Sequence, residues 1–150
     1  MARERVKISN DTGIHEFLRE QPMMALRMAP GGGRRLLGRF TFEAVHANFG
    51  RISDEFELDV ALPADFPRTV PEIRETGGKI PKNGKFHVND DGSFCLGSPM
   101  NLAMRLARNP TFGGFVKTCL IPYLYGVAYK LKNGEFPFGE LRHGIGGGEE

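Results

Sequence analysis

The segment HVNDDGSFCLGSP, residues 87–99, brings a histidine, an asparagine and a cysteine within nine positions, around a glycine-containing turn. The thiolate of a cysteine can attack a carbonyl carbon and form a covalent acyl intermediate, or it can bind a metal ion. No second cysteine lies near Cys95 in the sequence to complete a metal site or a local disulfide. Covalent chemistry is therefore one role for Cys95. The other is packing, because free cysteines are often small buried hydrophobic residues.

The size and composition of the chain limit the classes of protein to which this cysteine can belong. With 150 residues, of which 40% are hydrophobic and 25% charged, the chain is expected to form a single domain over residues 1–150. Its formal net charge is only +2, and the basic residues are spread along the sequence. Nucleic-acid-binding proteins gather basic residues on one face, so we expect no nucleic-acid partner.

The sequence also predicts a cytoplasmic protein without a membrane partner. Residues 1–11, MARERVKISND, lack the apolar core of a secretion signal, and no run approaches the roughly 18–20 apolar residues that cross a bilayer. A reducing cytosol is expected to keep Cys95 and Cys119 as thiols. No ligand spacing predicts a metal ion or another cofactor.

A short helix is expected near the start of the chain. Ile14, Phe17 and Leu18 have the i, i+3, i+4 spacing of one helical face. Asp11 or Thr12 can cap the start of this helix, and the proline at position 22 ends or bends it.

Two runs of alternating apolar and polar residues follow, on either side of the turn ANFG at residues 47–50. Such period-two alternation predicts an antiparallel hairpin with one face in water. The apolar positions are Phe40, Phe42, Ala44, Phe56, Leu58, Val60 and Leu62. The stretch MAPGGGRR before them, residues 28–35, is expected to be a mobile loop because of its glycines and proline.

The segment LPADFPRTVPEI, residues 62–73, is expected to carry the chain away from the sheet before a short edge strand at residues 70–76. Pro67 and Pro71 are expected to set this path. Residues 77–99 are rich in glycine, proline and polar residues, and predict a long irregular excursion that includes the cysteine. Excursions of this length inside a domain usually carry function.

The sequence after the excursion is helical in pattern. NLAMRLAR, residues 101–108, predicts one helix, and residues 112–132 predict another that Pro122 kinks or divides and Asn133-Gly134 closes. The face of the second helix is expected to hold Phe115, Cys119, Leu124, Ala128 and Leu131. A helix, antiparallel strands, a long loop and further helices together predict an α+β domain.

Two of these segments together resemble ubiquitin-conjugating (E2) enzymes, over roughly residues 12–132. LPADFPRTVPEI is similar to the strand and proline turn of that family. HVNDDGSFCL, residues 87–96, is similar to its His-Pro-Asn tripeptide, glycine turn and active-site cysteine. The ending FPFGELRHG, residues 136–144, further resembles bacterial E2-like proteins encoded with ubiquitin-like or antiphage signalling systems.

The resemblance implies an E2-like fold, in which an antiparallel meander sheet is flanked by an N-terminal helix and C-terminal helices. It implies that Cys95 carries a ubiquitin-like or other Gly-ended protein as a thioester, received from an E1-like activating enzyme, and transfers it to an amine. Asn89 is then the candidate amide donor to the carbonyl oxygen, where charge develops during attack. Asp90 and Asp91 are candidates to orient the amine and favour loss of its proton.

Three departures from the family pattern support other hypotheses. Val88 replaces the proline of the tripeptide, the loop from Asn89 to Cys95 is about two residues shorter, and no tryptophan follows the cysteine. The first two departures favour a catalytically retired E2 variant that only binds partners, whereas the presence of Cys95 favours an active carrier. A cysteine hydrolase that pairs Cys95 with His87 or His143 is a third hypothesis, without a recognisable signature.

Several candidate residues also have structural interpretations. Asn89 before Asp-Asp-Gly is typical of a plain turn, and His87 is more typical of a hydrogen-bonded loop anchor than of a base. Cys119, on an apolar helix face, is expected in the core. The terminal GGGEE, residues 146–150, is expected to be a disordered end rather than a conjugating tail.

Overall fold

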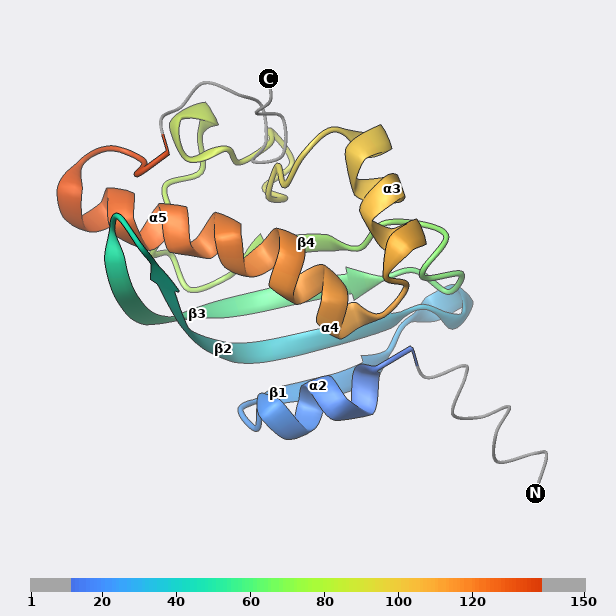
Figure 1. Ribbon diagram of the computed structural model, residues 1–150. Coiled ribbons are helices and arrows are strands. Elements are labelled where there is room, and N and C mark those ends of the chain that lie inside the picture. Colours follow the sequence, from blue (N-terminus) through green and yellow to red (C-terminus); the bar gives the residue numbers. More distant parts are fainter. Residues whose placement is uncertain (1–11, 139–150) are drawn as a thin grey trace.

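The computed structural model describes residues 12–138, which form a four-stranded antiparallel sheet with helices packed against it (Figure 1). The strands are β1 (Met24–Met28), β2 (Arg34–His46), β3 (Gly50–Leu62) and β4 (Glu72–Glu75), in that order across the sheet. The helices are α2 (Ile14–Glu20), α3 (Pro99–Arg108), α4 (Phe112–Phe115) and α5 (Ile121–Asn133). Three shorter turns are η1 (Pro30–Gly32), η2 (Gly84–Phe86) and η3 (Val116–Leu120). The expected α+β class and meander order are confirmed.

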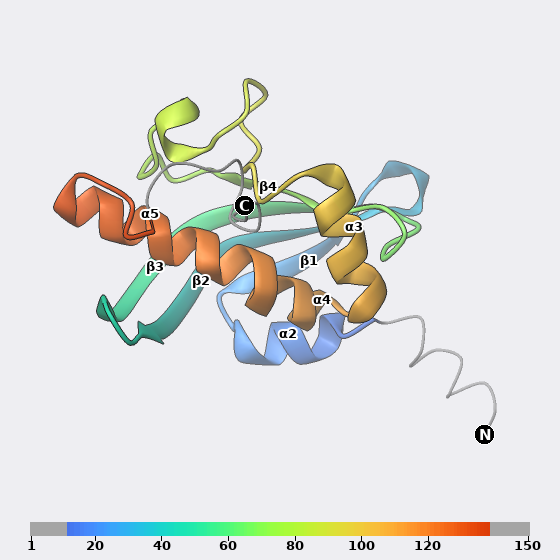
Figure 2. The same cartoon turned by 45° about the horizontal axis from the view of Figure 1, so that its top comes forward.

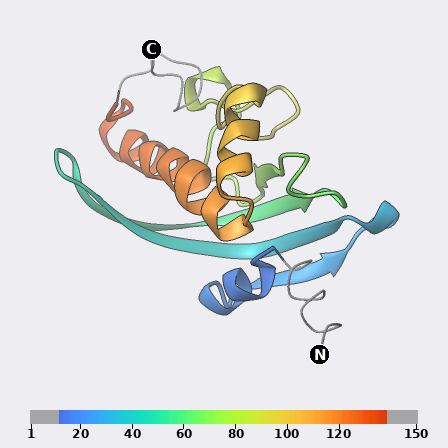
Figure 3. The same ribbon diagram turned by 45° about the vertical axis from the view of Figure 1, so that its right-hand side comes forward.

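The predicted hairpin is confirmed as β2 and β3, the two long strands of the sheet. They pair antiparallel with Phe40 opposite Phe56, across a turn that starts after His46 and ends at Gly50. The inward side chains are buried: Phe40 is 0% exposed and Phe56 is 1% exposed. Helices α3 and α5 lie over this inner face (Figure 3).

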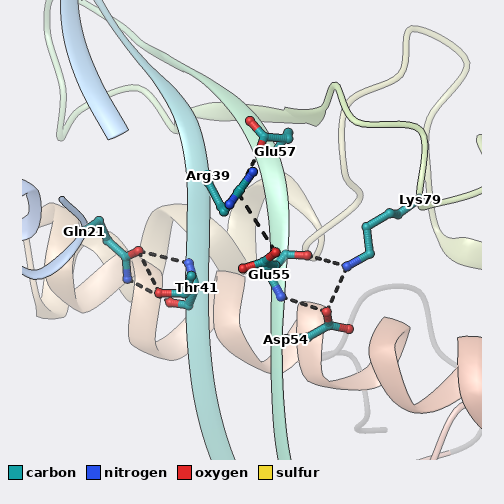
Figure 4. A network of polar contacts seen from close by, with 7 residues as sticks. All are labelled: Gln21, Arg39, Thr41, Asp54, Glu55, Glu57 and Lys79. Atoms are coloured by element: carbon teal, nitrogen blue, oxygen red, sulfur yellow. Dashed lines mark hydrogen bonds and ion pairs between the residues drawn. The ribbon is translucent and has the colours of Figure 1, made fainter. Parts of the chain in front are cut away.

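The other face of the hairpin carries charged and polar side chains, as the alternation predicts (Figure 4). Arg39 Nε donates to Glu57 Oε2 at 3.0 Å, across the β2–β3 pair. This pair is exposed, and such pairs add little stability. On the opposite side of β3, in line with Phe56, Lys79 Nζ donates to Asp54 Oδ1 at 2.8 Å and so ties the start of the irregular excursion to β3.

The loop expected at residues 28–35 is shorter in the structure, so the predicted bounds are wrong. Met28 is the last residue of β1, and β2 already begins at Arg34. The pattern missed β1 because only Met24 of its five residues is buried, which leaves no alternation to detect. Gly38 of β2 faces Met24 with a φ of 137°, and a Cβ there would lie 2.2 Å from Met23 O. Glycine is required at this close approach of the two strands.

Helix α2 is confirmed, with Ile14 and Phe17 buried. Its N-cap residue is Gly13, which has no side chain to accept a hydrogen bond, so Thr12 does not occupy the expected N-cap position. Asp11, the other candidate cap, lies outside the described residues. The helix lies at the β1 edge of the sheet and contacts α4, where Phe17 meets Phe112 edge to face at 4.8 Å (Figure 2).

The two C-terminal helical runs are also confirmed. Helix α3 is capped by Ser98, whose hydroxyl accepts the Asn101 N–H at 3.1 Å. The second run is divided by the π-helical turn η3 just before Pro122, and Gly134 closes α5 in the left-handed conformation. Leu131, however, is 41% exposed, so its predicted place on the buried face is wrong. Leu124 and Ala128 of the same predicted face are buried, at 0% and 8% exposure, so the face fails only in the last turn of α5, where Lys130 is buried instead.

The edge strand after the proline segment is confirmed, although β4 is shorter than the expected residues 70–76. The irregular excursion that follows is confirmed as well. It contains η2, returns to β4 through an isolated bridge between Arg74 and Ser93, and pairs with itself through a second bridge between Val88 and Phe94. The segment that carries Cys95 therefore lies beside β4, and it lines one pocket with the start of α3.

Candidate active site around Cys95

Cys95 lies immediately after the bridge between Val88 and Phe94, at the end of the excursion. Its backbone N–H donates to His87 O at 2.8 Å. Phe94 and Leu96 on either side are buried, at 7% and 6% exposure, whereas Cys95 itself is partly exposed. The cysteine is therefore not enclosed in the core like its neighbours, and its thiol borders a pocket.

This pocket has a volume of about 380 Å³. Its lining residues come from the proline segment, the excursion and the start of α3. They are Val70, Pro71, Glu72, Asn89, Ser93, Phe94, Cys95, Leu96, Gly97, Pro99 and Leu102. Most of these residues are apolar, and Asn89, Ser93 and Glu72 add an amide, a hydroxyl and a carboxylate. A largely apolar pocket with a few polar groups is the usual form of a binding site.

Asn89 and Cys95 therefore line the same pocket, six residues apart in the sequence. Asn89 is held in a tight turn: its backbone N–H donates to Ser93 O at 2.8 Å, and Gly92 N–H donates to Asn89 O at 2.9 Å. Its side-chain Nδ2 donates to Ser93 Oγ at 3.0 Å. These hydrogen bonds support the interpretation of Asn89 as a turn residue. A primary amide carries two N–H donors, so the bond to Ser93 leaves one for another acceptor.

The two aspartates of the segment lie outside this lining. Asp91 Oδ1 accepts both the Ser93 N–H at 2.9 Å and the Ser93 hydroxyl at 2.7 Å. The Ser93 side chain, then its backbone N–H, and also the charge of Arg74 hold the pKa of the Asp91 carboxyl below its ordinary value. Asp91 therefore acts as an ionised brace of the turn, and Asp90 is exposed.

The carboxylate that does line the pocket is Glu72 of β4, which the sequence analysis did not select. Its Oε1 lies 3.5 Å from Arg74 Nη1, and Arg74 also reaches Asp91 Oδ2 at 3.3 Å. Only the pairing of β4 with the returning excursion brings Glu72 beside Cys95. A glutamate that follows a proline at a strand start gave no such signal in the sequence.

His87 is placed as a loop anchor would be. Its φ of 57° is left-handed, which is uncommon for a residue other than glycine, and its carbonyl accepts the Cys95 N–H. The imidazole ring packs 5.0 Å from the ring of Phe136. His143 and the terminal GGGEE lie outside the described residues.

Helix α5 contacts the same loop from below with two polar side chains. Tyr123 Oη donates to Phe86 O at 2.7 Å, and Lys130 Nζ donates to Lys85 O at 2.6 Å. The sequence analysis missed both residues. Tyrosine and lysine in an amphipathic helix carry no signal for a loop carbonyl far along the chain.

The second cysteine is in the core, as expected: Cys119 is 3% exposed within η3, and both cysteines are free thiols. Among residues 12–138, no group of three or more His, Cys, Asp or Glu side chains could hold a metal ion. The described part of the chain also contains no helix long and apolar enough to span a bilayer.

We compared the sequence with protein-family models and with curated proteins, and neither comparison finds a match.

Proposed function

We propose that this protein has an E2-like fold and is an E2-like conjugating enzyme, in which Cys95 carries a ubiquitin-like or other Gly-ended protein as a thioester. An E1-like enzyme would supply the activated carboxyl group, and an amine would receive it, in a bacterial ubiquitination-like or antiphage pathway. The main support is one observation: a partly exposed cysteine and an asparagine amide line one pocket, in a loop between an antiparallel meander and C-terminal helices.

Two chemical steps are needed, and a thiol suits both. First, the Cys95 thiolate attacks the carbonyl carbon of the E1 thioester, and the thiolate of the E1 leaves. Then an amine attacks the new thioester, a tetrahedral oxyanion forms, the Cys95 thiolate leaves and the amine loses a proton. A serine ester would hold the acyl group too firmly for the second step, whereas a thiolate is a good leaving group.

The polar residues of the pocket have distinct roles in this proposal. The second N–H of the Asn89 amide stabilises the oxyanion. Glu72, rather than Asp90 or Asp91, is the acid that attracts and orients the amine, because it is the carboxylate in the pocket lining.

Incubation with ATP, a ubiquitin-like protein and an E1-like enzyme encoded by a neighbouring gene tests the proposal. We expect an adduct that reducing agent removes. Cys95→Ser should give a slower ester that resists thiols, and Cys95→Ala should give no adduct although it folds normally. Cys119→Ala is the matched control and should still charge, because Cys119 is buried.

The other hypotheses predict different results in the same assay. Binding without an adduct would favour the retired E2 variant. The Val88 replacement and the shortened loop also favour that hypothesis. Cleavage of a preformed conjugate would favour a cysteine hydrolase. An adduct on Cys95→Ala would assign the nucleophile to another residue and refute the role given to Cys95.

A further inference from the structure

Three consecutive carbonyl groups before the cysteine, those of residues 85–87, each accept a hydrogen bond from outside the turn that contains them. The donors are Lys130 Nζ to Lys85 O at 2.6 Å, Tyr123 Oη to Phe86 O at 2.7 Å, and Cys95 N–H to His87 O at 2.8 Å. Two donors thus come from α5, and the third is the backbone of the reactive residue. In Figure 2 this segment, in yellow-green, lies beyond β4 and next to α5.

Both side-chain donors are shielded from water. Tyr123 is 1% exposed, and its ring lies 4.6 Å from the ring of Phe94, the residue before the cysteine. Lys130 is 9% exposed, and its ammonium lies 4.6 Å from the ring centres of both Phe86 and Phe136. Hydrogen bonds are stronger where water cannot compete for the groups that form them.

Burial keeps the phenol of Tyr123 in its donating form. Burial raises the pKa of Tyr123, and the charges of Cys95 and Glu75 raise it further. The hydroxyl therefore remains protonated and continues to donate to Phe86 O when the nearby thiol is ionised. The Lys130 side chain is further held beside the turn by its cation–π contacts with the rings of Phe86 and Phe136.

We propose that Tyr123 and Lys130 are positioning residues for Cys95, which act by fixing the carbonyls of Phe86 and Lys85 and, through them, the carbonyl of His87. The left-handed conformation of His87 directs its carbonyl to the Cys95 N–H, and this conformation is unfavourable without external support. The geometric part of the proposal stands on its own, whereas its consequence for thioester transfer rests on the proposed function.

Amide hydrogen exchange measured residue by residue tests the geometric part. In Tyr123→Phe and in Lys130→Met, the Cys95 amide should exchange at least about fivefold faster, because one hydrogen bond that supports its acceptor is lost. The Phe94 amide is the internal control, since it donates to Ile73 O of β4 and not to the anchored turn. Its exchange should stay within about twofold of the unchanged protein.

Two further variants separate positioning from general loosening. Lys130→Arg keeps a cationic donor and should restore most of the protection at Cys95. Lys132→Met removes an exposed lysine from the same helix and should change neither amide. Equal acceleration at Phe94 and Cys95, or unchanged exchange at Cys95 in both anchor variants, would overturn the proposal.

A second readout tests the consequence for chemistry. If Cys95 forms a thioester, Tyr123→Phe and Lys130→Met should discharge it to lysine about fivefold more slowly, with Lys130→Arg near the normal rate. If the unchanged protein forms no thioester, the proposed function fails, but the exchange data still decide whether α5 positions Cys95. Normal discharge despite faster Cys95 exchange would limit these residues to a structural role and overturn the catalytic part.

Discussion

Substitution of Asn89 is the most direct test of the proposed chemistry, because its hydrogen-bond partner Ser93 offers a matched control substitution. Asn89→Ala and Ser93→Ala both remove the bond from Asn89 Nδ2 to Ser93 Oγ. Only the first removes the amide. Ser93→Ala also removes the hydroxyl bond to Asp91, so it disturbs the turn at least as much. A turn role and an oxyanion role therefore predict opposite orders of effect.

The expected size of the effect follows from the position of the amide. Removal of an enclosed oxyanion donor costs about 10² to 10³ in rate. Asn89 is exposed, so water competes with it, and a hydrogen bond to a charged group is then worth about 1.5–3 kcal/mol. Discharge of the thioester by Asn89→Ala should therefore be about 10- to 150-fold slower. Ser93→Ala leaves the amide present but free to rotate, and should slow discharge only about two- to fivefold.

Single-turnover discharge of purified thioester to free lysine measures the step that matters. Charging should proceed at a near-normal rate in both variants, because exchange between two sulfurs is nearly balanced and the activating enzyme assists it. Melting temperatures measured on the same samples report damage to the turn. Normal discharge by Asn89→Ala with a lowered melting temperature would refute the oxyanion role. So would equal slowing in the two variants.

Three further predictions concern the surroundings of the pocket. Pro67→Ala and Pro71→Ala should lower the melting temperature more than the transfer rate per folded molecule, because these prolines restrict the unfolded chain; the reverse result would place the proline turn in the chemistry. Glu72→Gln should slow discharge to lysine about tenfold at unchanged charging, whereas Asp90→Asn should not, and equal effects would remove Glu72 from the site. Asp91 has a lowered pKa when folded, so its stabilising effect is complete above its unfolded value of about 3.9 and is lost as the pH falls through the folded value. The difference in melting temperature between the unchanged protein and Asp91→Asn should therefore shrink at low pH, and a constant difference would contradict the bracing role.

Much of the fold was predictable because burial leaves a period in the sequence. Strands β2 and β3 bury every second residue, so Phe40, Phe56 and their neighbours alternate with charged residues. Strand β1 buries only Met24, and its exposed side chains carry no period that a sequence pattern could reveal. The face of α5 was predicted correctly at Leu124 and Ala128 but not at Leu131, because the last turn of the helix no longer buries that face, and the end of a core leaves no period in the sequence.

Only the residues of the candidate site that lie in one continuous segment of the sequence could be predicted. Cys95 and Asn89 lie close in sequence, and a tight turn between them brings both to one pocket. Glu72 reaches the pocket through the antiparallel pairing of β4, and Tyr123 and Lys130 reach the loop through the packing of α5. Such contacts depend on tertiary structure. A lysine near the end of a helix is usually solvated, whereas the ammonium of Lys130 is covered by the ring of Phe86, far along the chain, and by that of Phe136, just after α5.

Under the proposed E2-like assignment, Val88 stands where that family has a proline, and the contacts of Val88 bear on whether the site can remain ordered. Proline has no backbone N–H, whereas Val88 N–H donates to Asn83 O at 3.1 Å, and its side chain is 7% exposed. A hydrogen bond and a buried side chain thus restrain the position that a rigid ring restrains in the family this segment resembles. Since Val88 also bridges Phe94, this restraint passes directly to the residue before Cys95. A missing proline therefore does not by itself imply a disordered loop or a retired site, because the departure in sequence is matched by contacts that hold the same point of the chain.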